Sequence, residues 1–97
     1  MAAELPARFQ TTIPDDAVAP LVGRGSVVTF DSTIEPRAGD GILVRDSAWV
    51  CHFRRWRAGR PGEWEAYSMS DAYRTLESKR DGLKLLAVFV GAEHRLG

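Results

Sequence analysis

Short apolar stretches separated by turn-forming residues recur along this sequence. Residues 27–30 are β-branched or aromatic, and residues 42–45 contain a second apolar run. Residues 35–41, which lie between them, are rich in glycine, proline and aspartate, and these residues favour turns. The pattern therefore predicts two strands joined by a turn.

A hairpin is predicted next along the chain. Residues 48–56 and 63–67 alternate loosely between apolar and polar positions, and a Gly-Arg-Pro-Gly sequence at residues 59–62 separates them. This arrangement is typical of an antiparallel pair of strands. Residues 70–79 suit a short helical turn or a strand at a sheet edge equally well, and the sequence leaves both open.

Residues 83–90 form the last predicted element. They alternate at first and are then continuously apolar, and they lie between an Asp-Gly pair and Gly91. Well-buried strands have this pattern, so we expect a strand that is central or at an interface. With turn signals spaced roughly every 8–12 residues, the sequence predicts a mostly β fold, a compact sandwich or barrel with little helix.

The first residues of the chain differ from the rest. Residues 1–14 contain Pro6 and Pro14 and show no sustained periodicity. We therefore expect an N-terminal arm over residues 1–14, followed by one domain over residues 15–97. The total length of 97 residues suits a single domain and leaves no room for two.

Charge and composition exclude several classes of protein. The chain has 13 Lys and Arg against 13 Asp and Glu, so it lacks the surplus charge that drives non-specific binding to DNA or anionic membranes. Its N-terminus lacks the basic head and apolar stretch of a signal peptide, and its longest apolar run is far shorter than the roughly 20 residues of a membrane helix. Cys51 is the only cysteine, which excludes an intrachain disulfide and a multi-cysteine zinc site. We expect a cytoplasmic protein with no membrane contact, no metal and no cofactor.

A local basic cluster raises the question of nucleic-acid binding. Residues 54–60 contain four arginines around Trp56, and such groups can contact phosphates and stack on bases. Alternation along a strand sends adjacent arginines to opposite faces, and Glu63 and Glu65 on the paired strand can offset their charge. We therefore favour cross-strand pairing over direct nucleic-acid binding.

Other chemistry-bearing side chains on the predicted hairpin have simpler interpretations. His52 has no second histidine nearby that could complete a metal site. Cys51 lies in an apolar strand, where a lone cysteine is ordinarily a small core residue. The three tryptophans, Trp49, Trp56 and Trp64, are predicted to pack in the core.

Five sequence motifs follow one another in a familiar order. Asp-Asp-Ala-Val-Ala-Pro at residues 15–20 precedes Gly-Ser-Val-Val-Thr-Phe-Asp at 25–31 and Pro-Arg-Ala-Gly-Asp-Gly-Ile-Leu-Val at 36–44. His-Phe-Arg-Arg-Trp at residues 52–56 and Ser-Met-Ser-Asp-Ala-Tyr-Arg-Thr-Leu at 68–76 come next. In this order they resemble the LexA-like self-cleaving domains, the S24 peptidase family that includes C-terminal domains of phage repressors. The resemblance covers residues 15 to about 91 and implies a LexA-like fold for the domain.

The resemblance also implies that the catalytic positions have been lost. The family uses a neutral lysine to take a proton from a serine, whose oxygen then attacks a peptide bond. The matching positions here hold Ala17, which has no nucleophile, and Arg54, whose guanidinium stays protonated. The family cleaves an Ala-Gly or Cys-Gly bond upstream of its serine, whereas the Ala-Gly pairs of this chain, at residues 38–39 and 58–59, lie downstream. We therefore expect a pseudoenzyme with no peptidase activity.

Three residues form the framework of the degenerate cleft that the resemblance implies: Asp16, Pro20 and Arg54. Arg54 either forms a buried ion pair with Asp16 that fills the former catalytic cleft, or points to solvent from its strand. We favour the ion pair.

The resemblance leads to a functional hypothesis and one alternative. We expect the non-catalytic dimerisation and regulatory domain of a phage repressor-type, or prophage, transcriptional regulator. Domains of this family pair through their C-terminal strands, which implies a homodimer interface at Leu83, Leu85, Leu86, Val88 and Val90. DNA would be bound only by a helix-turn-helix domain that this sequence does not contain. The alternative is a stand-alone protein that binds a peptide or a repressor partner in its degenerate cleft.

Overall fold

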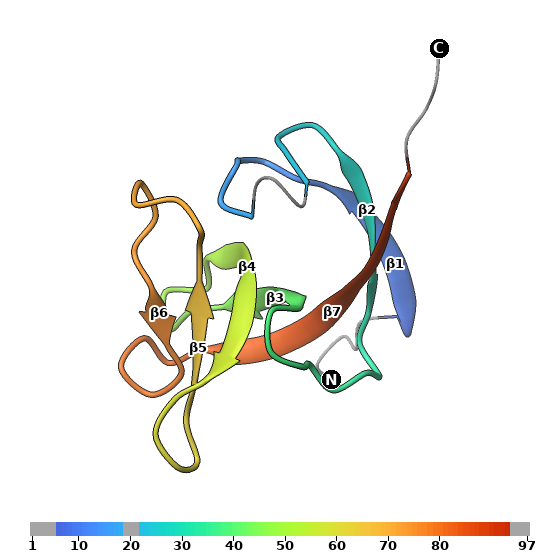
Figure 1. Cartoon of the computed structure of the whole chain (residues 1–97). Helices are drawn as coiled ribbons and strands as arrows, with labels where there is room; N and C mark the ends of the chain where they lie inside the picture. Colours follow the sequence, from blue (N-terminus) through green and yellow to red (C-terminus); the bar gives the residue numbers. More distant parts are fainter. Residues whose placement is uncertain (1–5, 19–21, 94–97) are drawn as a thin grey trace.

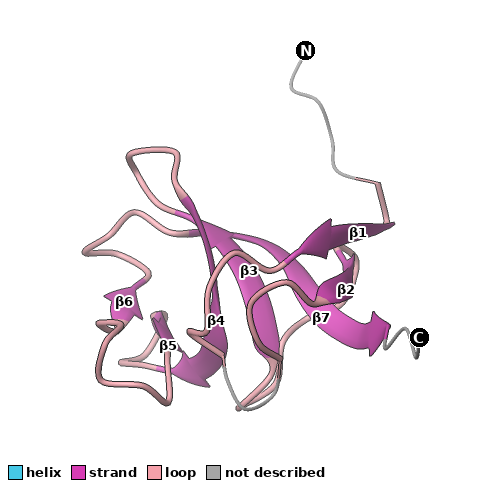
Figure 2. Ribbon diagram, turned by 90° about the horizontal axis from the view of Figure 1, so that it is seen from above, coloured by secondary structure: helices cyan, strands magenta, loops and turns pink. Residues whose placement is uncertain are grey.

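The computed structural model describes residues 6–18 and 22–93 of the chain. In these ranges the backbone forms strands connected by loops and turns, with no helix (Figures 1 and 2). The strands are β1 (Arg8–Thr12), β2 (Val27–Asp31), β3 (Gly41–Arg45), β4 (Cys51–Ala58), β5 (Trp64–Tyr67), β6 (Leu76–Glu77) and β7 (Lys84–Glu93). The prediction of a mostly β fold with little helix is confirmed. The described residues contain no helix that is long and apolar enough to cross a membrane.

The strands join into one antiparallel sheet of order β1-β2-β7-β3-β4-β5-β6. The long strand β7 lies between β2 and β3 (Figure 1), which confirms a central strand at residues 83–90. Residues 70–79 form no helix, and their regular secondary structure is β6, a short strand at one sheet edge.

The sheet is curled. Residues of β1 and β4 line the same cavity, although β2, β7 and β3 separate these two strands in the sheet order. Figure 1 shows β7 bending between the two halves of the sheet. The curl brings the end of β1 and the residues that follow it close to β4.

Apolar side chains form a core cluster on each face of the sheet. Successive residues of a strand point to opposite faces, and the adjacent β7 residues Ala87 and Val88 belong to different clusters. Burial on both faces explains why the last strand is continuously apolar. The first cluster contains Ile13, Val18, Val22, Val28, Phe30, Phe53 and Ala87. The second contains Ile42, Val44, Ala66, Leu76 and Val88.

Aromatic rings lie at the centre of the first cluster. The ring centroids of Phe30 and Phe53 are 5.1 Å apart in an edge contact, and those of Phe53 and Phe89 are 6.0 Å apart. Gly41 lies against them, because a Cβ atom at this position would be 2.7 Å from the Phe53 ring. Close packing therefore requires glycine at the start of β3.

The arm predicted over residues 1–14 contains a strand. β1 pairs with β2 over its whole length, and the adjacent Ile13 is buried in the first cluster. Only Phe9 of β1 packs against the core, because β1 is an edge strand whose other residues are exposed. β1 therefore lacks the alternating apolar pattern that identifies strands. The predicted boundary between residues 14 and 15 runs through one folded unit.

Candidate functional site

The two positions that the LexA-like resemblance assigns to a lost catalytic pair contact the same carboxylate. The loop after β1 carries Asp15, whose Oδ1 accepts a hydrogen bond of 3.0 Å from the backbone N–H of Ala17. The other carboxylate oxygen of Asp15 lies 3.9 Å from Nη1 of Arg54 on β4. Ala17 and Arg54 therefore lie near different oxygens of one carboxylate.

The connection between β5 and β6 contacts Ala17 and Arg54 as well. The hydroxyl of Ser68 donates a short hydrogen bond to the carbonyl oxygen of Ala17. The ring of Tyr73 lies 5.0 Å from the Arg54 guanidinium carbon, a distance at which a cation is attracted to an aromatic face. We call these five residues the Arg54 site: Asp15, Ala17, Arg54, Ser68 and Tyr73.

Arg54 is buried, with 7% of its surface exposed. Its Nη1 donates a hydrogen bond of 2.8 Å to the carbonyl oxygen of Phe53, whereas its Nε is buried without a hydrogen-bond partner among the described residues. Burial lowers the pKa of Arg54, and the negative charge of Asp15 opposes this shift. Because a guanidinium in water holds its proton at any working pH, Arg54 stays protonated and does not serve as a general base.

The predicted cleft framework needs one correction. Asp15 rather than Asp16 is the carboxylate that faces Arg54. Asp16 Oδ1 instead accepts a hydrogen bond of 2.8 Å from the backbone N–H of Arg24, and its own backbone N–H donates to the Tyr73 hydroxyl at 3.4 Å. The chain turns at these residues, so the adjacent carboxylates point to different neighbours. The third predicted framework residue, Pro20, lies outside the described residues.

The predicted dimer interface also needs a correction. Val88 is 2% exposed and belongs to the chain's own second core cluster, so it is not available to a partner. Leu83 and Leu85 pack against that cluster, and Leu86 is half-buried. Val90, at 38% exposed, is the one clearly exposed member of the predicted set. β7 pairs with β3 through residues 84–88 on one edge and with β2 through residues 88–93 on the other, so each edge is paired over part of its length.

A small cavity lies beside the Arg54 site. Its volume is about 160 Å³, and it lies between residues 11–14 and residues 51–53 over a base of Phe30 and Leu43. The two walls continue along the chain into Asp15 and Arg54. We call this space the β1–β4 cavity. Sequence reasoning missed it because its walls come from segments that no local pattern connects.

Part of β4 has an open edge next to this cavity. β4 pairs with β3 through residues 51–55, but β5 pairs only with residues 55–58. Residues 51–54 therefore have no strand partner, among the described residues, on the side away from β3. Cys51 at the start of this edge is exposed.

Two residues of the hairpin depart from their predicted core positions. Trp49 is 74% exposed at the tip of the turn between β3 and β4, where its φ of 66° is in the left-handed region and the Arg45 guanidinium carbon lies 3.8 Å from its ring centroid. Cys51 is exposed as well. Trp56 and Trp64, in contrast, pack against the second core cluster as expected.

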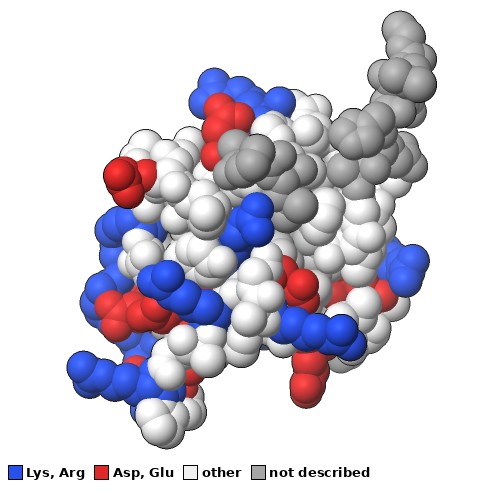
Figure 3. All heavy atoms as spheres, viewed as in Figure 1, with Lys and Arg blue, Asp and Glu red and all other residues white. Residues whose placement is uncertain are grey.

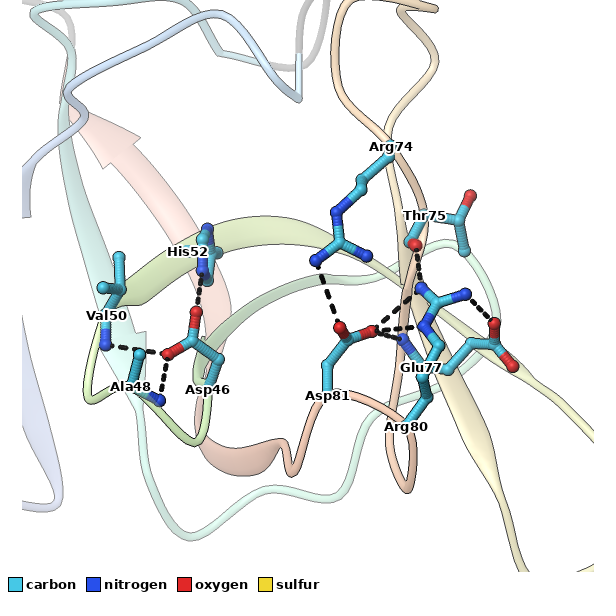
Figure 4. A network of polar contacts seen from close by, with 9 residues as sticks. All are labelled: Asp46, Ala48, Val50, His52, Arg74, Thr75, Glu77, Arg80 and Asp81. Carbon is cyan, nitrogen blue, oxygen red and sulfur yellow. Dashed lines mark hydrogen bonds and ion pairs between the residues drawn. The ribbon is translucent and has the colours of Figure 1, made fainter.

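Asp46 organises the turn that carries Trp49 (Figure 4). One of its oxygens lies 2.8 Å from His52 Nε2, and the other accepts backbone N–H groups of Ala48 and Val50 at 2.8 and 3.0 Å. The hydrogen bond from His52 and then those from the turn lower the pKa of Asp46. His52 is therefore a structural partner of this turn.

A second aspartate holds the connection between β6 and β7 (Figure 4). Asp81 accepts from the guanidinium of Arg74 at 3.1 Å, from that of Arg80 at 2.9 Å, and from the backbone N–H of Glu77 at 2.7 Å. Partial burial of Asp81 opposes its ionisation, but these hydrogen bonds outweigh burial and lower its pKa. The network joins the segment after Tyr73 to the start of β7.

The arginines of β4 show the predicted cross-strand pairing at one position. Arg57 Nε lies 2.6 Å from Glu65 on β5, and its guanidinium carbon lies 4.6 Å from the Tyr67 ring centroid. Figure 3 shows basic and acidic side chains interspersed on the face of the molecule that it draws. The described residues contain no group of three or more His, Cys, Asp or Glu that could hold a metal ion.

The sequence matches no model of a known protein family and no curated protein.

Proposed function

We propose that this chain is a catalytically inactive domain of the LexA-like type that binds an extended segment of a repressor-type partner beside its former catalytic positions. The observation that carries the proposal is the contact of Asp15 with both Ala17 and Arg54. The order of the five sequence motifs supports the same family. The open edge of β4 and the β1–β4 cavity support the binding role.

The chemistry of the Arg54 site argues against peptide-bond cleavage. Ser68 is the hydroxyl nearest to Ala17 in this network, and its oxygen accepts a hydrogen bond of 3.0 Å from the backbone N–H of Ser70 while its proton goes to the Ala17 carbonyl. A serine becomes nucleophilic when a neighbouring base removes its proton. Arg54 holds its own proton at working pH, so it does not activate this hydroxyl.

An extended segment fits the open part of β4. Backbone groups on an unpaired strand edge pair with an incoming strand, and a pocket beside the edge selects a side chain. Alternation of hydrogen-bonding direction places the backbone groups of Cys51 and Phe53 on the side away from β3. The β1–β4 cavity lies directly against these residues.

The homodimeric regulator remains the competing hypothesis. It would use β7, where the described residues leave Val90 as the one clearly exposed apolar member of the predicted interface. We therefore favour peptide binding over dimerisation. DNA contact, in either case, would come from a separate helix-turn-helix domain.

Binding can be tested by NMR titration of the ¹⁵N-labelled full chain with a synthetic repressor-type linker peptide. We expect shifts in the backbone signals of residues 11–14 and 51–54. A Cys51→Trp variant fills the cavity from an exposed position and should weaken binding at least tenfold, whereas Val50→Trp, at an exposed neighbour outside the cavity lining, should not. Shifts confined to β7, or equal effects of the two variants, would refute the proposed site.

A further inference from the structure

The hydrogen bonding of Arg54 is incomplete. A guanidinium carries five N–H donors, and the acceptor within hydrogen-bond distance of Arg54 in the described residues is the Phe53 carbonyl. The carboxylate of Asp15 is 3.9 Å away, beyond the range of a hydrogen bond. Nε is buried with no partner in the described part of the chain. Buried donors without acceptors are costly, so this arrangement favours an additional acceptor.

A carboxylate is the acceptor that best suits an arginine. Its two oxygens match the guanidinium fork and form short, charge-assisted hydrogen bonds. Asp15 does not fill this role, because one of its oxygens is used by the backbone of Ala17 and the other is too distant. Arg54 itself is not part of the cavity lining, but its Nη1 lies on the carbonyl of the lining residue Phe53, so a carboxylate bound at that end of the cavity would lie next to the guanidinium.

The size and lining of the cavity limit which kind of ligand can carry that carboxylate. At about 160 Å³ the cavity is smaller than the roughly 300–1,000 Å³ of sites that enclose a whole small molecule. Ile13, Pro14, Phe30, Leu43 and Phe53 make most of its lining apolar. It therefore suits one apolar side chain of a longer ligand.

The position of the Arg54 guanidinium indicates where a bound peptide would end. The backbone groups of Trp56 form hydrogen bonds with residues 39 and 40, so they point toward the β3 side of β4. Hydrogen-bonding direction alternates along a strand, so the carbonyl of Phe53, three residues earlier, points to the open edge of β4. Arg54 Nη1 covers that carbonyl. A strand pairing along residues 51–53 would meet the guanidinium at this point, and a chain terminus places a carboxylate there.

We infer that Arg54 is the receptor for the C-terminal carboxylate of a peptide whose last side chain is apolar and enters the β1–β4 cavity. The inference rests on the proposed function, because the same open edge must accept the peptide. It adds the chain direction of the bound segment, the residue that binds its end, and the class of its last side chain. The arginine that removes catalytic function thereby acts as a binding residue.

The test compares three tripeptides in NMR titrations of the full chain. The first is N-acetyl-Ala-Val-Leu with a free carboxylate, the second is the same peptide with a C-terminal amide, and the third is N-acetyl-Ala-Val-Asp-amide, whose carboxylate is on a side chain. We expect the free acid to bind at least about tenfold more tightly than either amide, as charge-assisted hydrogen bonds allow. The Nε–H signal of Arg54 should shift with the free acid.

Variants identify the group responsible. Arg54→Gln should abolish the preference for the free acid, and Arg57→Gln, an exposed arginine on the same strand that pairs with Glu65, should preserve it. The Nε–H signal of the wild-type chain answers the same question if Arg54→Gln does not fold.

The results distinguish peptide binding at the open edge of β4 from recognition of a C-terminal carboxylate by Arg54. Equal binding of acid and amides, with shifts at residues 51–54, would overturn the carboxylate inference and leave peptide binding standing. Tight binding of the aspartate amide would overturn the assignment to a chain terminus. Absence of binding by these tripeptides and by the longer linker peptide at millimolar concentration would overturn both.

Discussion

Substitution of Gly41 by alanine tests whether β3 approaches the aromatic cluster as closely as the structure indicates. The added Cβ would lie 2.7 Å from Phe53 Cε1 and 3.0 Å from Phe89 Cβ, whereas carbon atoms in contact are ordinarily about 3.5–4.0 Å apart. Phe53 is 3% exposed and held between Phe30 and Phe89, so its ring has little space to retreat. Overpacking of this kind costs about 1–3 kcal/mol. The reduced entropy of the unfolded chain offsets about 0.4–1 kcal/mol of that cost.

We therefore expect Gly41→Ala to lower the free energy of unfolding by about 1–2 kcal/mol. For a domain of this size the loss corresponds to a decrease in Tm of about 4–16 °C. Urea denaturation followed by tryptophan fluorescence measures the free energy, and calorimetry measures Tm. The affected ring lines the β1–β4 cavity, so the same variant should also weaken peptide binding.

Two comparisons make the Gly41 prediction specific. Gly91→Ala, on β7, adds a Cβ with nothing within 4 Å and should change stability by less than about 0.5 kcal/mol or increase it slightly. In a Phe53→Leu background the cost of Gly41→Ala should fall by about 1 kcal/mol, because the smaller side chain frees the space. The packing argument is refuted if Gly41→Ala is as stable as the wild type, or if its cost is unchanged in the Phe53→Leu background.

Four further results are expected. Asp15→Asn leaves the buried Arg54 without its neighbouring carboxylate. Since the Asp15 side chain is 29% exposed, we expect the free energy of unfolding, measured by urea denaturation, to fall by about 1–3 kcal/mol. A larger fall for Asp16→Asn would contradict the observed pairing of Asp15 with Arg54. Asp46 has a lowered pKa in the folded state, so its contribution to stability is present above the unfolded pKa of about 4 and is lost as pH falls through the folded value. Asp46→Asn should therefore reduce the loss of stability on acidification between about pH 5 and pH 2. If the free energy of unfolding of this variant depends on pH as in the wild type, the partners of Asp46, His52 among them, do not stabilise the turn. The intact mass of the chain should stay unchanged after prolonged incubation at alkaline pH, and light scattering over a concentration series should give the mass of one chain, whereas self-cleavage or a dimer would favour the competing hypotheses.

Several strands in the second half of the chain can be predicted from local signals. Residues 83–90 are continuously apolar because β7 is buried on both faces, and the turn at residues 59–62 separates two strands that pair with each other. These features depend on burial and turn chemistry within short stretches, so they can be read from the sequence. β1 was not predicted, because an edge strand with exposed polar residues shows little of the apolar pattern by which strands are identified.

Only part of the candidate site could be predicted from the sequence. The motifs at residues 15–20 and 52–56 indicated that Ala17 and Arg54 belong together, and the structure links them through one carboxylate. The identity of that carboxylate was mispredicted by one position. Adjacent side chains in a turn point in different directions, so a shift of one residue exchanges the partner of Arg54 for a group that binds the backbone of Arg24.

The sequence by itself determined that the protein is mostly β, that its last strand is central, and that no serine or lysine occupies the two positions compared with a catalytic pair. Only the tertiary structure decided that Val88 is internal, that Trp49 is exposed, and that an open edge of β4 borders a cavity. The first group depends on the identity and spacing of nearby residues. The second depends on where one strand stops pairing and how far the sheet curls, and these are properties of contacts between segments distant in the sequence.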